Sequence, residues 1–232
     1  LAWNGQVSDA LSVCERAVQL DPQNANSYAF LAEAYLMARR TADASQRAQT
    51  AVQLAPQSAE AHRALAWVLT IQGHKDTALI EWKQTVALEP DFYFRHFEFG
   101  EVLRVYFNNP TDAVTEHQKA VSLYGAYIPS ISRLGLSLLA ANRPPEAVPQ
   151  FQRAITLDPG GAENYAYLGV AYGQTNRCSQ AIPYFEQALR LDVNHSLARQ
   201  GATDCRSNKP PTLAPVTVPT VPIPPPTLVP GK

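Results

Sequence analysis

One short phrase returns six times along the chain, and its even spacing constrains the fold more than any other feature. The six versions are ERAVQLDP, QTAVQLAP, KQTVALEP, QKAVSLYG, QRAITLDP and EQALRLDV. Successive versions are 34, 34, 35, 34 and 34 residues apart, counted at their last residues Pro22, Pro56, Pro90, Gly125, Pro159 and Val193. Such a period is typical of chains that stack one small unit against the next, because no single unit can bury its own apolar face.

Each unit divides into two stretches with a helical period. In the fifth, ISRLGLSLLAANR carries apolar residues at three- and four-residue steps, at Ile131, Leu134 and Leu138. The second stretch, PPEAVPQFQRAITLDP, opens on prolines, which the first turn of a helix tolerates. It closes on Pro159, which a helix interior does not tolerate. The pattern predicts an all-α, antiparallel helix-hairpin solenoid without strands.

The two ends of the array should differ from its middle. We expect eleven full helices over about 7–192. Residues 1–3 are expected to be the last turn of an earlier helix and Asn4-Gly5 the turn after it. The helix over 7–20 would then lack its hairpin partner and fray first. At the other end, HSLARQGATDC predicts a capping helix over about 196–205, since a terminal repeat needs a polar outer side.

The recurring columns resemble the tetratricopeptide repeat family over roughly residues 4–192. The family's first helix carries Leu-Gly or Leu-Ala followed by Tyr, and its second carries Ala, an aromatic residue, Ala and a closing Pro. The resemblance implies a right-handed solenoid of about five and a half 34-residue repeats with a C-terminal capping helix. The unit ending at Pro159 matches these columns with Ile131, Leu134, Gly135, Leu138, Ala147, Phe151, Ala154 and Pro159.

Small residues in these columns would let the two helices of a hairpin approach closely. A Leu at such a position would overpack the joint. The pairs that we expect to face each other are Ala32 with Ala44, Ala66 with Ala78, Gly135 with Ala147, and Gly169 with Ala181.

The stretch DFYFRHFEFG, residues 91–100, alternates aromatic and other residues as a strand would. The 34-residue register nevertheless aligns His96, Phe99-Gly100 and Leu103 with the first-helix seam of the other repeats. Phe94 and Phe97 then lie on another face. The register therefore predicts a helix with aromatic residues on two faces.

Composition changes abruptly near the C-terminus, so we divide the chain into a repeat array over 1–205 and a Pro/Thr/Val-rich linker or tail over 206–232. Residues 210–232 hold nine prolines in 23 residues, which precludes a helix or a central strand there. Polyproline-II or disordered linker is the favoured interpretation. The tail could instead offer proline motifs to aromatic-lined domains, although only Lys209 and Lys232 flank it.

Charge and motifs argue against several function classes. The 19 Lys and Arg against 20 Asp and Glu give a formal net charge of −1, so no electrostatic footprint for nucleic acid is expected. No apolar run reaches the roughly 20 residues of a membrane helix, and we expect no direct membrane insertion. We found no phosphate-binding loop or zinc motif, so we expect no catalytic residue, metal or cofactor. His62, His96 and His117 are interpreted as packing residues, with a His96–His117 metal or proton site as the alternative.

The resemblance also implies a function. In the family, first helices line the concave surface and bind an extended peptide or a partner helix, so we expect a non-catalytic scaffold with a protein or peptide partner. The alternative is a regulatory or substrate-docking arm of a larger enzyme. The family's Lys and Asn carboxylate clamp is absent, so we expect a ligand that binds through apolar and aromatic anchors and could add a basic group near Glu33 or Glu101. The predicted groove residues are Glu33, Met37, Arg63, Trp67, Ile71, Phe94, Phe97, Glu101, Arg104, Leu136, Leu139 and Val170, with Ser132 and Ala166 on the same face.

Two of the three cysteines should come together. Cys178 opens the last second helix and Cys205 lies near the end of the capping helix, and consecutive helices run antiparallel. A disulfide between them is therefore possible, with Cys14 free; two ordinary thiols in a cytosolic protein are the alternative. A disulfide would indicate an oxidising, extracytoplasmic compartment.

Overall fold

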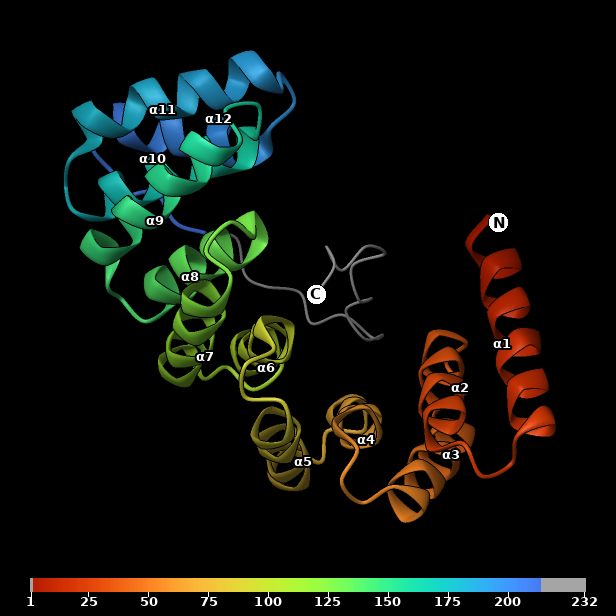
Figure 1. Ribbon diagram of the computed structural model, residues 1–232. Coiled ribbons are helices and arrows are strands. Elements are labelled where there is room, and N and C mark those ends of the chain that lie inside the picture. The colour runs from red at the N-terminus through yellow and green to blue at the C-terminus, as the bar shows by residue number, and fades with distance from the viewer. Residues whose placement is uncertain (1, 214–232) are drawn as a thin grey trace. The chain divides into compact units, whose positions relative to one another are not determined.

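The computed structural model describes residues 2–213, with side chains from Val7 onward, and every regular element in this range is an α-helix (Figure 1). The prediction of an all-α fold is thereby confirmed. The helices are α1 (Ala2–Leu20), α2 (Ala25–Met37), α3 (Thr41–Leu54), α4 (Ala59–Ile71), α5 (Lys75–Leu88), α6 (Tyr93–Val105), α7 (Pro110–Leu123), α8 (Ile128–Ala140), α9 (Pro144–Leu157), α10 (Ala162–Gln174), α11 (Cys178–Leu191) and α12 (Ser196–Arg206).

The helices fall into two compact units, which are described separately. The first, α1 to α5, ends at Pro90, and the second, α6 to α12, begins at Asp91. Within each unit, consecutive helices pack against each other. Alternate first helices also touch, as α2 touches α4 and α6 touches α8. This is the packing of stacked helical hairpins.

The beginning of the chain differs from the prediction. α1 is continuous from Ala2 to Leu20 and passes through Asn4-Gly5, so the predicted turn there is wrong. A glycine inside a helix costs only about 1 kcal/mol relative to alanine, which a helix of this length absorbs. α1 also pairs with α2, where the Tyr35 hydroxyl donates to Glu15 Oε1 at 2.9 Å.

Each first helix from α2 to α10 is followed by one residue with left-handed backbone. Asparagine and glycine adopt this region at low cost, and four of the five residues are of these types. In every case the second helix begins two residues later, so this residue fixes where the hairpin turns. The φ angles are 58° at Arg39, 78° at Gly73, 48° at Asn108, 57° at Asn142 and 59° at Asn176.

In the second unit, glycines on first helices make room for rings on second helices. A Cβ placed on Gly135 would lie 2.5 Å from the Phe151 ring, and one on Gly169 would lie 2.6 Å from the Phe185 ring. The predicted facing partners, Ala147 and Ala181, are fully buried but are not the nearest neighbours of these glycines. At these two positions the nearest neighbour of the glycine is therefore an aromatic ring and not the expected alanine.

The aromatic stretch after Asp91 forms helix α6, as predicted. Its rings build a buried cluster with the turn that joins α7 to α8. Tyr127 packs against this cluster, 5.2 Å from the ring of Tyr93 and 5.6 Å from that of Phe97. Phe94 stacks on Phe97 at 5.5 Å. The two faces of the helix thus pack in the core of the second unit.

In the first unit the corresponding seam is filled by two indole rings. Trp67 of α4 meets Trp82 of α5 edge to face, with ring centroids 5.2 Å apart. The Trp82 Nε1 group donates to Thr70 Oγ1 at 3.1 Å, which satisfies its buried donor.

Candidate functional site

A buried carboxylate joins α6 to α8 in the second unit. Glu101 accepts two hydrogen bonds from Arg104, from Nε to Oε1 and from Nη2 to Oε2, each at 2.9 Å. Arg133 of α8 approaches the same carboxylate, with Nε 3.1 Å from Oε2. The Glu101 side chain is 5% exposed, whereas that of Arg133 is 37% exposed. We call Glu101, Arg104 and Arg133 the arginine site.

Electrostatics favour the ionised form of Glu101. Burial by itself raises the pKa of the Glu101 carboxyl, but the hydrogen bond and charge of Arg104, followed by the charges of His117 and Arg133, outweigh it. The net result is a lowered pKa. One carboxylate between two guanidinium groups leaves the arginine site with one excess positive charge, and Arg133 carries it nearest to solvent.

Two further titratable groups adjoin the arginine site. His117 of α7 is fully buried and its Nδ1 lies 2.9 Å from Ser137 Oγ, while its Nε2 lies 3.6 Å from Glu101 Oε1. Burial lowers the pKa of His117 to about 4, against the opposing attraction of Glu101. Burial, with the charge of Glu101, raises the pKa of Tyr106 to about 12. Both side chains are therefore neutral at pH 7.

Polar contacts also connect α8 to α10. The Ser132 hydroxyl donates to Asn164 Oδ1 at 2.7 Å, which ties α8 to α10. Tyr167 of α10 is partly buried, and its pKa is raised by burial and by Glu163 while the charges of Arg133 and Arg104 oppose the rise. The Tyr167 ring is thus within electrostatic range of the arginine site.

Sequence reasoning placed Glu101 and Arg104 correctly on one face but missed Arg133 and Tyr167. A signal for Arg133 was available, because it is the sole charged residue of α8. A charge isolated in an otherwise apolar helix usually has a partner or a ligand.

The predicted exposure of the groove residues is wrong for most of them. Trp67 and Val170 have no exposed surface, and neither does Ala166. Trp67 is covered by Trp82, and Phe94 and Phe97 by the tyrosines of their cluster. These side chains are core, because Trp82 of the same hairpin packs on Trp67 and Tyr127 at the start of the next hairpin packs on Phe97. The residues that are buried are Arg63, Trp67, Phe94, Phe97, Glu101, Leu136, Leu139, Ala166 and Val170, whereas Glu33, Met37, Ile71, Arg104 and Ser132 are partly exposed.

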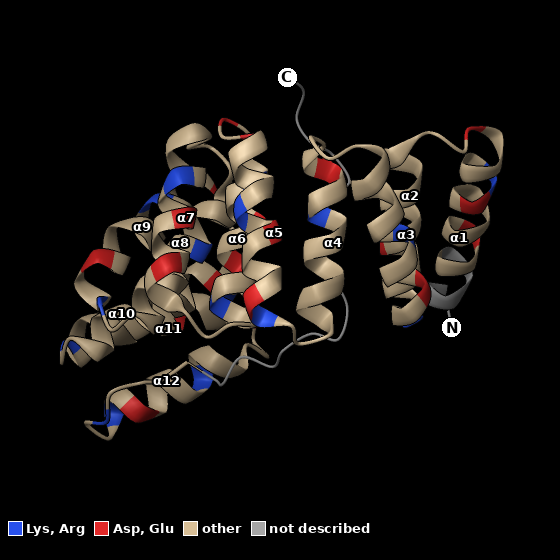
Figure 2. Ribbon diagram, turned by 90° about the horizontal axis from the view of Figure 1, so that it is seen from below, with Lys and Arg blue, Asp and Glu red and all other residues tan. Residues whose placement is uncertain are grey.

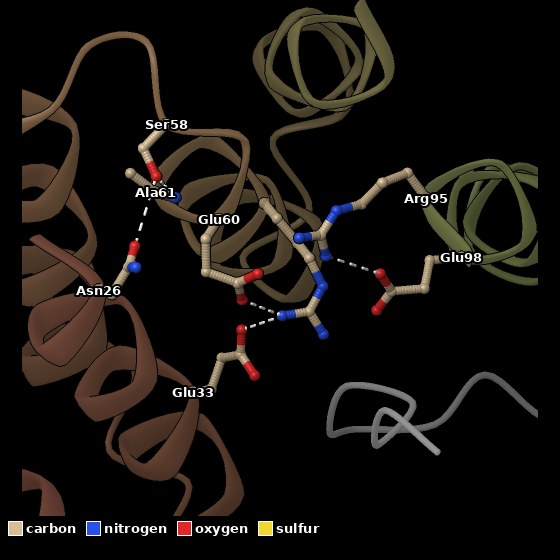
Figure 3. Close-up of polar contacts among 8 residues, drawn as sticks. Asn26, Glu33, Ser58, Glu60, Ala61, Arg95 and Glu98 are labelled. Carbon is tan, nitrogen blue, oxygen red and sulfur yellow. Dashed lines mark hydrogen bonds and ion pairs between the residues drawn. The ribbon is translucent and has the colours of Figure 1, made fainter. Parts of the chain in front are cut away.

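The predicted groove residues of the first unit carry a separate ionic contact. The Arg63 guanidinium bonds to Glu60 Oε1 at 2.7 Å and also to Glu33 (Figure 3). Both carboxylates that were expected to bind a basic ligand group, Glu33 and Glu101, already bind an arginine of the protein. These contacts weaken the expectation of a basic ligand group. At Glu101, two arginines overcompensate the carboxylate, so a basic group there is disfavoured.

Of the three histidines interpreted as packing residues, His62 and His96 pair with glutamates. His62 Nδ1 lies 2.6 Å from Glu81, and His96 Nδ1 lies 2.7 Å from Glu116. His117 instead faces Ser137. Among the described residues, no group of three or more His, Cys, Asp or Glu side chains could hold a metal ion.

The two predicted partner cysteines lie together in the structure. The Cα atoms of Cys178 and Cys205 are 5.0 Å apart and their sulfur atoms are joined in a disulfide. Cys14 is a free thiol, and burial, then Glu33 and Glu15, raise its pKa. Of the predicted linker over 206–232, only residues up to Leu213 fall within the described range.

Lysine and arginine residues are interspersed with aspartate and glutamate on the helices of each unit (Figure 2). No helix within the described range is long and apolar enough to cross a membrane.

Comparisons with known proteins agree with this architecture. Tetratricopeptide repeat models match residues 3–68 and 132–194, together more than half of the chain. No curated protein sequence matches significantly. The crystal structure of YrrB, described as a TPR protein with an unusual peptide-binding site, superposes with a TM-score of 0.69 at 20% identity, covering 84% of this chain and 100% of that one.

Two further solved structures show the same fold. The MamA protein gives a TM-score of 0.64 at 19% identity, over 73% of this chain and 92% of that chain. PilF from Pseudomonas aeruginosa gives 0.60 at 21% identity, over 78% and 88%. Folds of this type serve generally as non-catalytic scaffolds for protein–protein interaction. With repeat models matching at both ends and the hairpin stack between them, the chain belongs to the tetratricopeptide repeat family.

Proposed function

We propose that this protein is a non-catalytic interaction module that binds an extended segment of a partner protein across α6, α8 and α10 of the second unit. The arginine site would receive an acidic side chain or a terminal carboxylate of that segment. The partly exposed guanidinium of Arg133, held beside a buried and already paired Glu101, is the observation that carries the proposal.

The arginine site is suited to an anion because its two guanidinium groups outnumber its single carboxylate. Arg104 donates to both oxygens of Glu101, so its guanidinium is held in a fixed position and also adds a positive charge to the site. Arg133 makes one contact to that carboxylate and keeps more than a third of its side chain exposed. A guanidinium has five N–H donors, and the remaining donors of Arg133 can reach a ligand carboxylate in a bidentate pair.

The neighbouring residues would fix the direction of the segment. Tyr167 offers a partly buried ring and a hydroxyl on α10, and Ser132 and Asn164 offer further polar atoms on α8 and α10. The predicted groove residues Arg104 and Ser132 belong to this face, and their binding role stays a proposal. The same face would serve whether the partner is a separate protein or another domain of a longer chain.

A selection from a random peptide library tests the proposal without knowledge of the natural partner. Peptides that bind the wild-type chain should be enriched in Asp, Glu or a free C-terminal carboxylate. Arg133→Gln should weaken the binding of the selected peptides roughly 10- to 100-fold, because a hydrogen bond to a charged group contributes about 1.5–3 kcal/mol. Binding should also weaken as salt rises.

Arg143→Gln is the matched control, since Arg143 is a solvent-exposed arginine that pairs with Glu146 on α9. Both variants should keep the melting temperature of the wild type within a few degrees, because Glu101 retains Arg104 when Arg133 is replaced. Selected peptides without acidic groups, or equal binding by the two variants, would contradict the proposal.

A further inference from the structure

A second surface of the second unit has the chemistry of a ligand site and lies away from the arginine site. It is an open pocket of about 770 Å³ between α10 and α11. Three tyrosines line it, Tyr165 and Tyr172 from α10 and Tyr184 from α11, together with Pro183. We call it the tyrosine pocket.

The rings of the tyrosine pocket are held in place. Tyr172 and Tyr184 stack with centroids 5.3 Å apart and planes 7° from parallel. The Arg177 guanidinium lies 4.9 Å from the centroid of the Tyr172 ring, and Gln152 Nε2 donates to the Tyr172 hydroxyl at 3.3 Å. Rigid aromatic side chains lose little conformational entropy on binding, so they are effective contact surfaces.

The polar lining of the tyrosine pocket is mostly neutral. Arg190 is the one charged residue that lines the tyrosine pocket, and its Nε already donates to Gln187 at 2.8 Å. The side-chain amides of Gln180 and Gln187 and the Tyr165 hydroxyl can donate hydrogen bonds to carbonyl groups, whereas the Tyr184 hydroxyl is hydrogen-bonded to Tyr172. A neutral segment with flat apolar rings and regularly spaced, unpaired backbone carbonyls fits this lining. Polyproline-II segments have both properties.

We propose that the tyrosine pocket binds a proline-rich segment, and that its occupant is the chain's own sequence 219–225. This sequence, PTVPIPP, places Pro219, Pro222 and Pro225 three residues apart. A polyproline-II helix has three residues per turn, so these prolines share one edge at intervals of about 9 Å. Tyr165 and Tyr172 are seven residues apart on α10, about 10 Å along the helix axis, so successive prolines can meet successive rings.

The described part of the chain ends close enough for this segment to reach the pocket. Pro211 is buried against α10, where a Cβ on Gly173 would lie 2.3 Å from its ring, and Leu213 packs against the core of the second unit. The Lys209 carbonyl lies 3.7 Å from Cys178 Sγ, at the start of α11. Six residue steps separate Leu213 from Pro219 and can span about 20 Å, more than the 10–12 Å diameter of a helix.

Fluorine NMR of the full chain labelled with 3-fluorotyrosine tests this proposal. The signals of the three pocket tyrosines are assigned by single Tyr→Phe substitutions. The test variant carries Pro219→Ser, Pro222→Ser and Pro225→Ser. The matched control carries Pro215→Ser, Pro224→Ser and Pro230→Ser, which removes as many prolines at positions out of phase with the three-residue spacing of the other set.

The test variant should shift the pocket signals, and the control should leave them at their wild-type positions. A synthetic peptide of residues 217–228 should return the signals of the test variant to their wild-type positions. Tyr184→Ala, introduced into the test variant, should weaken the binding of this peptide about tenfold or more, because aromatic anchors dominate such contacts. The wild-type spectrum should be unchanged on dilution, since an intramolecular contact has a fixed effective concentration.

Three results would each overturn the assignment. Identical spectra of the wild type and the test variant would show that the segment does not reach the pocket. Equal shifts in both triple variants would show that the tyrosine pocket responds to the proline content of the tail and not to the three-residue spacing of Pro219, Pro222 and Pro225. Signals that revert on dilution would show that the occupant comes from a second copy. None of these results bears on the arginine site, which can bind its partner whether or not the tyrosine pocket is filled.

Discussion

His117→Phe should make the protein less sensitive to mild acid. His117 is buried and neutral, and its pKa falls from 6.5 in the unfolded chain to about 4 in the fold. Between these values the unfolded state binds a proton that the folded state does not, so the stability is lost as pH falls from 6.5 towards 4. At 1.36 kcal/mol per pH unit, the loss amounts to about 3 kcal/mol.

A phenylalanine fits the site of His117. Phe151 and Phe185 occupy the corresponding place against Gly135 and Gly169, and a Cβ on Gly100 would lie 2.6 Å from the His117 ring. The substitution removes the contact to Ser137, so it should cost about 1–2 kcal/mol at pH 7, where His117 is neutral in both states. The two stability curves should then converge as pH falls and cross near pH 5.

Urea unfolding at half-unit intervals from pH 7 to pH 5 gives the comparison. Glu101 does not affect the pH dependence of stability between pH 7 and pH 5. Its pKa is lowered in the fold, so the stabilisation that it gives is lost only as pH falls below 4.5, the usual pKa of a glutamate. His74→Gln, which alters an exposed histidine, is the control and should keep the wild-type slope. An unchanged slope in His117→Phe would refute the reasoning that a buried neutral His117 causes the acid sensitivity.

Three other perturbations address the packing of the repeats. Gly135→Ala should destabilise the fold by about 1–3 kcal/mol in urea unfolding, because the new Cβ would meet the Phe151 ring. Gly160→Ala, at an exposed glycine, should be nearly neutral, and equal effects of the two substitutions would contradict the close packing at Gly135. Cys205→Ser should lower stability by about 3 kcal/mol under non-reducing conditions, since the bond closes 27 residues, and dithiothreitol should remove the difference from wild type. Hydrogen exchange should be faster in α1 than in α10, which has neighbours on both sides; equal protection would contradict this.

The repeat period was sufficient to predict where the helices lie in the sequence, but not which of their side chains are buried or paired. Helix α9 begins and ends where its prolines place it, and α11 follows at the 34-residue spacing, because capping and turn chemistry are local. The left-handed residues at Asn142 and Asn176 follow the same period and could have been located from the sequence. The start of α1 was misjudged because Asn4-Gly5 reads as a turn unless the helix continues on both sides.

Burial and pairing depend on neighbours that the period does not describe. Trp67 and Phe97 share their register positions with polar residues in other repeats, and only the contacts with Trp82 and Tyr127 show that they are core. The sequence predicts that Glu101 is a charged residue on a first helix. That Arg104 and Arg133 both bind it, so that these three side chains together carry one excess positive charge, follows from three-dimensional contacts alone.

The central claim is that α6, α8 and α10 of the second unit bind a partner segment through the arginine site. Its most direct test is the mapping of amide and side-chain shifts in NMR spectra while a selected acidic peptide is titrated into the full chain. The largest changes should fall on the Arg104 and Arg133 guanidinium signals and on the Tyr167 ring. If the changes fall elsewhere and leave these three side chains unaltered, the site has been assigned to the wrong face.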